Sequence, residues 1–153
     1  MMTRIIREVL AMAILTSLLA ACAGERPHNL GVHDGTLAPC PSAPNCVSSR
    51  TDDERHRIAP LCFTDEPRAA FARLRRILAE RDDTTFVREE SSYLRVEFRT
   101  RLGFVDDGEF LLDPDGRCIH VRSASRLGYS DLGKNRSRIE EIRSRFAGTE
   151  RTK

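Results

Sequence analysis

The sequence has no apolar run long enough to cross a membrane. Its main uncharged apolar stretch covers residues 9–21, which is well short of the about 20 residues that a transmembrane helix needs. Neither sign of charge dominates, since 25 Lys and Arg residues balance 23 Asp and Glu residues and lysine occurs only at Lys134 and Lys153. We therefore expect no permanent membrane span and no nucleic-acid partner.

Signatures of catalysis are also scarce. Ser48 and Ser49 lack the glycine-flanked elbow of hydrolases, and His28, His33 and His56 have no spacing that assembles a nucleophilic triad. No Cys-x-x-Cys motif of thioredoxin-like redox sites is present. The sequence indicates no cofactor and no resident metal, and it does not favour an enzyme.

What the sequence does have at its start is the order of an export signal. Arg4 and Arg7 precede the apolar run, and small residues end it. This order is typical of a signal peptide. We expect residues 1–21 to be a signal peptide that is removed on export.

Leu19-Ala20-Ala21-Cys22 resembles the lipobox of bacterial lipoproteins. The resemblance implies that Cys22 becomes the first mature residue and carries a diacylglycerol and an amide-linked acyl chain such as palmitate, enough for stable anchoring. Ala23, and not aspartate, follows it, which by resemblance to Gram-negative sorting favours the periplasmic face of the outer membrane. We expect an exported, membrane-anchored lipoprotein.

One folded domain should follow the anchor. Residues 22–38 are rich in Gly, Pro and small polar residues, which is typical of a tether. Residues 39–148 have apolar periodicity and enough length for one modest core, and residues 149–153 form a tail. We expect a lipidated tether, a single domain and a short C-terminal tail.

The periodicity of this domain predicts the order β-α-β-β-β-β-α. A helix over 67–81 starts with proline in its first turn, and Ser137 with Glu140 forms a capping box that opens the last helix, with Gly148 beyond its end. The expected strands cover residues 58–63, 84–89, 93–100, 104–112 and 117–125. Because hairpins connect most of the strands, we expect a two-layer α+β fold, with an antiparallel sheet of about five strands and two helices on one face.

Four cysteines remain besides Cys22, an even number in a protein expected to enter an oxidising compartment. Two disulfides among Cys40, Cys46, Cys62 and Cys118 have three possible connectivities. Five residues, two of them prolines, separate Cys40 from Cys46, which favours a small structural loop closed by this pair. Cys62 and Cys118 then pair with each other or stay free.

The hairpin after residue 112 brings polar residues together. If the turn over 113–116 sets the register, Glu109 lies opposite His120 and Asp107 lies opposite Arg122. Asp107, Glu109 and His120 could then hold a divalent metal or act as an acid–base pair, so they are weak catalytic candidates.

A ladder of salt bridges is the favoured interpretation of the same face. Arg95, Glu97 and Arg99 fall on it by strand parity, so opposite charges can neutralise one another. Asp106 points the other way, toward the helices, where its carboxylate needs a partner such as Ser123 or a loop N–H.

Three separated motifs occur in one order along the chain: Cys40 to Ser49, Asp106 to Phe110, and Arg122 to Arg126 with Gly128 to Gly133 and Asn135-Arg136. Together they resemble the family catalogued as domain of unknown function 1499, over roughly residues 39–146. Gly108 occupies a position where that family more often has an apolar residue. The resemblance implies no particular activity.

The loop over residues 122–136 is the preferred ligand site. It ends at a helix N-terminus, and arginine forks hold carboxylate or phosphate well. Alternatively its charges are paired internally, Asp131 with Arg126 and Asp107 with Arg122, and the loop only fastens the last helix to the sheet. The candidate ligand-binding residues are Arg122, Ser123, Ser125, Arg126, Tyr129, Ser130, Asp131, Asn135 and Arg136.

Three functions therefore stay open. The first is a non-enzymatic envelope lipoprotein that binds an anionic small molecule, a lipid headgroup or an envelope protein through the 122–136 loop. The second is an enzyme or metal-binding protein that uses Asp107, Glu109 and His120. The third is a structural or assembly factor that works through protein contacts alone.

Overall fold

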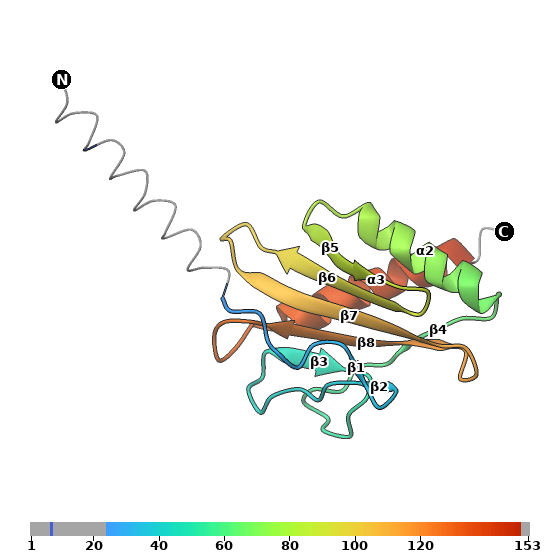
Figure 1. Ribbon diagram of the computed structural model, residues 1–153, viewed down its shortest axis with the longest axis horizontal. Coiled ribbons are helices and arrows are strands. Elements are labelled where there is room, and N and C mark those ends of the chain that lie inside the picture. The colour runs from blue at the N-terminus through green and yellow to red at the C-terminus, as the bar shows by residue number, and fades with distance from the viewer. Residues whose placement is uncertain (1–6, 8–23, 151–153) are drawn as a thin grey trace.

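The computed structural model of the chain describes residue 7 and residues 24–150 (Figure 1). Apart from Arg7, the expected signal peptide lies outside the described residues, as do Cys22 and residues 151–153 of the expected tail. Within the described part, no helix is both long and apolar enough to span a membrane.

The main sheet is antiparallel and has six strands, one more than the about five expected. Its order is β3 (Cys46–Ser48), β8 (Cys118–Ser125), β7 (Val105–Asp113), β6 (Tyr93–Arg99) and β5 (Thr84–Glu89), while β4 (Leu61–Cys62) also pairs with β8. The extra strand is β3, which is too short to show alternation. The expected strand over 58–63 is reduced to β4, because Pro60 has no N–H to donate to a neighbouring strand. The mixed α+β class is confirmed.

Two helices complete the domain, and the first agrees with the sequence. Helix α2 (Pro67–Ala79) has Pro67 in its first turn, as expected. Helix α3 (Lys134–Glu150) begins three residues before Ser137 and includes Gly148. The prediction of a capping box at Ser137 is therefore wrong, and the loop before Lys134 supplies the cap instead.

One continuous core joins both helices to the sheet. Leu94, Val96 and Phe98 alternate with polar residues along β6, and this expected alternation places their side chains inside. Each such side chain stabilises the fold by about 1.5–3 kcal/mol when it is fully buried. The core also includes Leu74, Leu78, Phe110, Ile119, Val121, Ile139, Ile142 and Phe146.

The segment expected to be a tether is folded over most of its described part. Strands β1 (Val32–His33) and β2 (Thr36–Leu37) form a hairpin whose turn, Asp34-Gly35, has positive φ at both residues. Leu30, Leu37 and Ala38 are buried. The tether prediction is thus wrong for these residues, because two-residue strands leave no periodic signal.

Two disulfides are present. Cys40 is bonded to Cys46, which closes the short loop before β3. Cys62 is bonded to Cys118, and these two residues are direct cross-strand partners on β4 and β8. The predicted Cys40–Cys46 loop is confirmed, and of the two alternatives left open for Cys62 and Cys118 the structure has the disulfide.

Candidate functional site

The β7–β8 hairpin has a register that differs from the predicted one. Asp113 pairs with Cys118, so the connecting loop covers residues 114–117 and not 113–116. Arg117 adopts a left-handed conformation, with φ of 50°. The loop keeps its predicted length of four residues but lies one residue further along the chain, so each residue of β7 pairs with a residue of β8 two positions later than predicted.

The altered register changes which polar residues meet. Glu109 lies opposite Arg122 and not His120, and Asp107 lies opposite Ala124 and not Arg122. Arg95 and Glu97 of β6 lie opposite Glu109 and Asp107 of β7. These side chains are therefore on one face of the sheet, as the strand alternation predicted. The polar residues share a face as expected, but their neighbours on β8 are different.

Glu109 is the centre of a covered polar cluster. It is 0% exposed, and it accepts hydrogen bonds from the backbone N–H of Gly31 (2.7 Å), from Tyr93 Oη (2.7 Å) and from Arg122 Nη1 (3.2 Å). Burial, together with the charge of Glu109, raises the pKa of Tyr93, so the tyrosine stays a donor. These partners leave Glu109 no open side toward a substrate.

Asp107 is also held by internal partners. Arg126 donates to both of its carboxylate oxygens, each at 2.8 Å, and reaches Glu97 Oε1 at 2.6 Å. The hydrogen bond to Asp107 raises the pKa of Arg126, which keeps the guanidinium charged. Arg26 of the N-terminal segment contacts the same Glu97 oxygen. The favoured ladder of salt bridges is present in part: Glu97, Asp107 and Glu109 are paired, but with Arg126, Arg122 and Arg26 and not with Arg95 or Arg99.

His120 lies away from both carboxylates and has other partners. Its Nδ1 is 3.2 Å from Ser49 Oγ, and its Nε2 is 3.4 Å from Asp113 Oδ2. Burial, aided by the nearby Arg50 charge, lowers the pKa of His120. The sequence did not indicate this Ser-His-Asp set, because its members come from three separate segments.

Ser49, His120 and Asp113 connect the residue after β3 to the β7–β8 hairpin. Ser49 Oγ accepts a hydrogen bond from the backbone N–H of Val121 at 2.9 Å, which holds the serine against β8. Among the described residues, no group of three or more His, Cys, Asp or Glu side chains could hold a metal ion. Asp107, Glu109 and His120 therefore do not converge into the metal or acid–base site that the sequence suggested.

The three arginines of the 122–136 loop are all occupied within the protein. Arg122 pairs with Glu109, and Arg126 pairs with Asp107 and Glu97. Arg136 donates to two backbone carbonyls, those of Arg57 (2.8 Å) and Arg55 (3.0 Å). The alternative that the charges of this loop are paired within the protein agrees with these contacts. The two pairs that it named, Asp131 with Arg126 and Asp107 with Arg122, are wrong.

Asn135 connects this loop to the sheet and is fully buried. Its side chain accepts a hydrogen bond from Ser123 Oγ (2.5 Å) and donates to Ser125 Oγ (2.9 Å). Arg138 donates both to Asn135 Oδ1 and to Asp106 Oδ2, at 3.0 and 2.7 Å. The partner of Asp106 is thus Arg138 and not Ser123, because Ser123 donates its hydrogen bond to Asn135.

Asp131 caps the N-terminus of α3. Its two carboxylate oxygens accept hydrogen bonds from the backbone N–H groups of Gly133 (3.0 Å) and Asn135 (2.7 Å). Positive φ values at Leu132 and Gly133 bend the chain so that this contact forms. The amides that were expected to bind an anion are therefore satisfied in part by an internal carboxylate.

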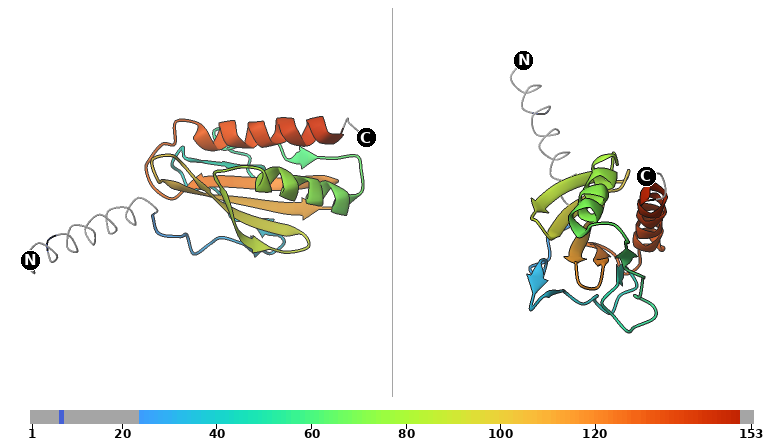
Figure 2. Two further views of the ribbon diagram at one scale, coloured as in Figure 1. Left: turned by 90° about the horizontal axis from the view of Figure 1, so that it is seen from above. Right: turned by 90° about the vertical axis from the view of Figure 1, so that its right-hand side faces the viewer.

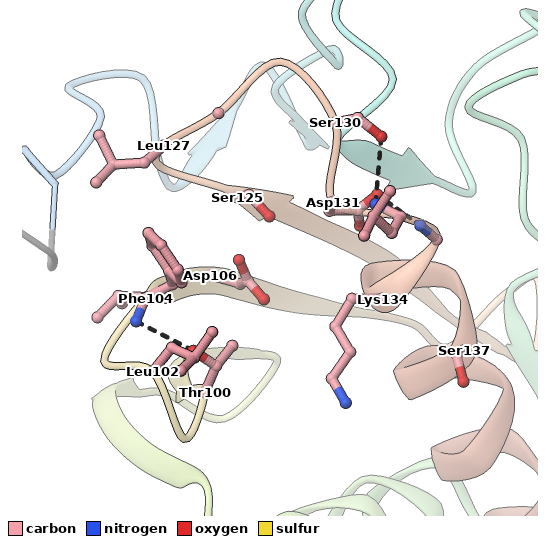
Figure 3. A pocket seen from close by; sticks show the side chains of 14 residues that line it. Thr100, Leu102, Phe104, Asp106, Ser125, Leu127, Ser130, Asp131, Lys134 and Ser137 are labelled. Carbon is pink, nitrogen blue, oxygen red and sulfur yellow. Dashed lines mark hydrogen bonds between the residues drawn. The ribbon is translucent and has the colours of Figure 1, made fainter.

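A pocket opens on the other side of the same loop. Its volume is about 540 Å³, within the range of about 300–1,000 Å³ usual for small-molecule sites. It lies between the β6–β7 turn and the β8–α3 loop, as Figure 3 shows. Its lining includes Leu102, Phe104, Asp106, Ser125, Leu127, Ser130, Asp131, Leu132, Lys134 and Ser137.

The pocket is apolar at its rim and has one cationic side chain. Leu102 and Leu132 are 78% and 96% exposed, and Phe104 and Leu127 are also exposed. The ammonium group of Lys134 has no ion pair with any described residue. Of the expected ligand residues, only Ser125, Ser130 and Asp131 line the pocket. The sequence indicated the loop but not the leucines, whose spacing is not periodic.

The fold and the site together define an antiparallel α+β domain with an apolar pocket at one end of its sheet. Residues 36–146 match the family described as Protein of unknown function (DUF1499). The chain belongs to this family. The match begins at β2, just ahead of the expected domain start at residue 39. No curated protein matches the chain.

Proposed function

We propose that this protein is an exported lipoprotein, anchored through Cys22 to the periplasmic face of the outer membrane. The support lies in the N-terminal sequence, where two arginines, an apolar run and small residues precede the cysteine in that order. A diacylglycerol and an amide-linked acyl chain on Cys22 hold the mature chain on a membrane surface.

The domain, in this proposal, binds an anionic amphiphile in the pocket between the β6–β7 turn and the β8–α3 loop. The observation that carries the proposal is the exposure of four large apolar side chains around that pocket, with Lys134 as the nearby cation. Contiguous exposed apolar surface is typical of a binding site. An acyl chain would cover Leu102 and Leu127, and an acidic headgroup would pair with Lys134.

Other elements of the protein pack on both faces of the sheet, which supports the end of the sheet as the ligand site. Both helices contribute to the single core, and we infer that they cover one face together. The N-terminal segment covers polar residues of the opposite face through Glu97 and Glu109. The anion is assigned to Lys134, because the arginines of the loop have internal partners.

Two small amphiphiles with chains of similar length test the proposal. Sodium octanoate and octyl glucoside, each below its micelle concentration, are titrated into the purified protein while the melting temperature is followed. Ligands that bind only the folded state raise this temperature. We expect octanoate to raise it more than octyl glucoside and inorganic phosphate to leave it unchanged. No shift with octanoate, or an equal shift with phosphate alone, would contradict the proposal.

A pair of variants locates the acidic headgroup. Lys134→Gln should weaken octanoate binding by up to about fivefold, since an exposed ion pair contributes up to about 1 kcal/mol. It should leave octyl glucoside binding unchanged. Arg101→Gln is the matched control, because Arg101 is an exposed cation of the β6–β7 turn that does not line the pocket. Equal losses in both variants would point to general attraction of anions.

A further inference from the structure

The N-terminal segment is bound along the sheet. Arg26 Nη2 lies 2.6 Å from Glu97 Oε1, and the backbone N–H of Gly31 lies 2.7 Å from Glu109 Oε1. The described part of the segment begins at the end of the sheet that carries the β6–β7 turn and the β8–α3 loop, as Figure 1 and Figure 2 both show. Its path therefore fixes where the preceding residues attach to the domain.

The first residue of this segment, Gly24, packs directly on the loop after β8. A Cβ atom at position 24 would lie 2.9 Å from both Arg126 Cβ and Leu127 Cγ, and Leu127 lines the pocket. Cys22 is two residues before Gly24, and an extended chain covers at most about 3.3–3.6 Å per residue. The lipid would thus be attached within about 7 Å of Gly24, next to the rim of the pocket.

This end of the domain holds most of the exposed apolar side chains of the described residues. Five of the six large ones lie in the β6–β7 turn or the β8–α3 loop, and only Val32 lies elsewhere. Such a concentration is unfavourable in water and indicates a contact surface. The five are Leu102, Phe104, Leu127, Tyr129 and Leu132.

Hydrogen-bonded turns hold these side chains outward. Thr100 N donates to Phe104 O at 2.9 Å, and Phe104 N donates to Thr100 Oγ1 at 3.1 Å, which closes the β6–β7 turn. Leu132 has a φ of 54°, and its N–H donates to Ser130 Oγ at 3.2 Å. The two segments are therefore shaped to present apolar groups.

Two cations accompany the apolar side chains. Arg101 in the β6–β7 turn and Lys134 at the start of α3 are both exposed, and neither forms an ion pair with another described residue. A basic side chain near an anionic lipid surface contributes about 1 kcal/mol to binding. Apolar side chains together with free cations match the chemistry of a lipid interface.

We infer that the pocket end of the domain is seated in the membrane leaflet that carries the Cys22 lipid. Leu102, Phe104, Leu127 and Leu132 enter the boundary between headgroups and acyl chains, and the pocket opens toward the leaflet. The inference rests on the lipid anchor of the proposed function. It adds the orientation of the domain and names a lipid bilayer as the occupant of this surface.

A single introduced indole tests the orientation, because the chain contains no tryptophan. Leu132→Trp places the reporter on the apolar rim, and Leu102→Trp gives a second one on the other turn. Asp115→Trp is the matched control, since Asp115 is an exposed residue of the β7–β8 turn at the opposite end of the sheet. The lipidated chains are purified from cell membranes and reconstituted in phosphatidylcholine–phosphatidylglycerol vesicles, with or without brominated acyl chains.

We expect brominated lipid to remove most of the fluorescence of Leu132→Trp and Leu102→Trp and to leave Asp115→Trp unchanged. An interfacial contact places apolar groups about 5–10 Å deep, within reach of the quencher. Unquenched rim tryptophans, or equal quenching at all three positions, would overturn the inference. The mass of the N-terminal peptide separates the causes: lipid on Cys22 without rim quenching refutes the orientation alone, whereas an unmodified Cys22 refutes the anchor and the inference together.

Discussion

The backbone N–H of Gly31 donates a hydrogen bond of 2.7 Å to the carboxylate of Glu109, 78 residues further along the chain. The same carboxylate accepts hydrogen bonds from Tyr93 and Arg122. One buried charge therefore joins the N-terminal segment to three strands of the sheet. The orientation inferred for the domain depends on this contact, because it holds the segment that follows the proposed lipid anchor.

Removing this carboxylate should be strongly destabilising. Glu109→Ala leaves the charge of Arg122 buried without a partner, which typically costs about 3–5 kcal/mol. Urea unfolding at neutral pH measures the loss. Glu89→Ala is the matched control, since Glu89 forms a partly exposed ion pair with Arg75, and the expected loss is under about 1 kcal/mol. Comparable losses in the two variants would contradict the assigned role of Glu109.

Arg126 should behave as a structural residue and not as part of an anion site. Arg126→Ala leaves Asp107, which is buried, and Glu97 without their main partner, so its melting temperature should fall. Added sulfate should not stabilise the wild type beyond its general salt effect. If the variant were as stable as the wild type and sulfate specifically stabilised only the wild type, Arg126 would be a ligand residue.

The stability of the domain should depend on pH through His120. Burial, followed by the charge of Arg50, lowers the pKa of His120 in the folded state, so protonation favours unfolding. The stability from neutral His120 is complete above the unfolded pKa of about 6.5 and is lost as the pH falls below that value. His120→Gln should flatten the fall in unfolding free energy between about pH 7.5 and about pH 5.5. The exposed His28 gives the control His28→Gln, and the hypothesis fails if both variants keep the wild-type slope.

Gly108 should tolerate no side chain unless its neighbour becomes smaller. A Cβ at this position would overlap the ring of Phe98 on the adjacent strand. Gly108→Ala should therefore destabilise by about 1–3 kcal/mol, as overpacking does. Adding Phe98→Leu should recover part of this loss, and thermal unfolding of the single and double variants measures it. A stable Gly108→Ala protein, with no coupling to Phe98, would show that this part of the core is not tightly packed.

The regular part of the fold could be predicted from the sequence, because its signals are local. Strand alternation identified β6, and the proline in the first turn of α2 marked the start of that helix at Pro67. The short elements could not be predicted in this way. Strand β3 and the β1–β2 hairpin are held by contacts with distant residues, as Gly31 with Glu109 illustrates.

The candidate site could be predicted only in part, for a related reason. Strand alternation placed Glu109 on the correct face, but its partner depended on the position of one turn. The β7–β8 loop lies one residue later than predicted and ends at a left-handed Arg117. The loop after β8, which the sequence favoured as a ligand site, lines part of the pocket, although its arginines have partners within the protein. Leu102 comes from a different turn, and only the folded chain places it around the same pocket as Leu132.

The central claim is that this domain works at a membrane surface to which Cys22 anchors it. Intact-mass and N-terminal peptide measurements on the protein extracted from cell membranes test the claim most directly. We expect a mature chain that begins at Cys22 and carries a thioether-linked diacylglycerol and an amide-linked acyl chain. A chain that keeps residues 1–21, or one whose Cys22 is absent or unmodified, would contradict it.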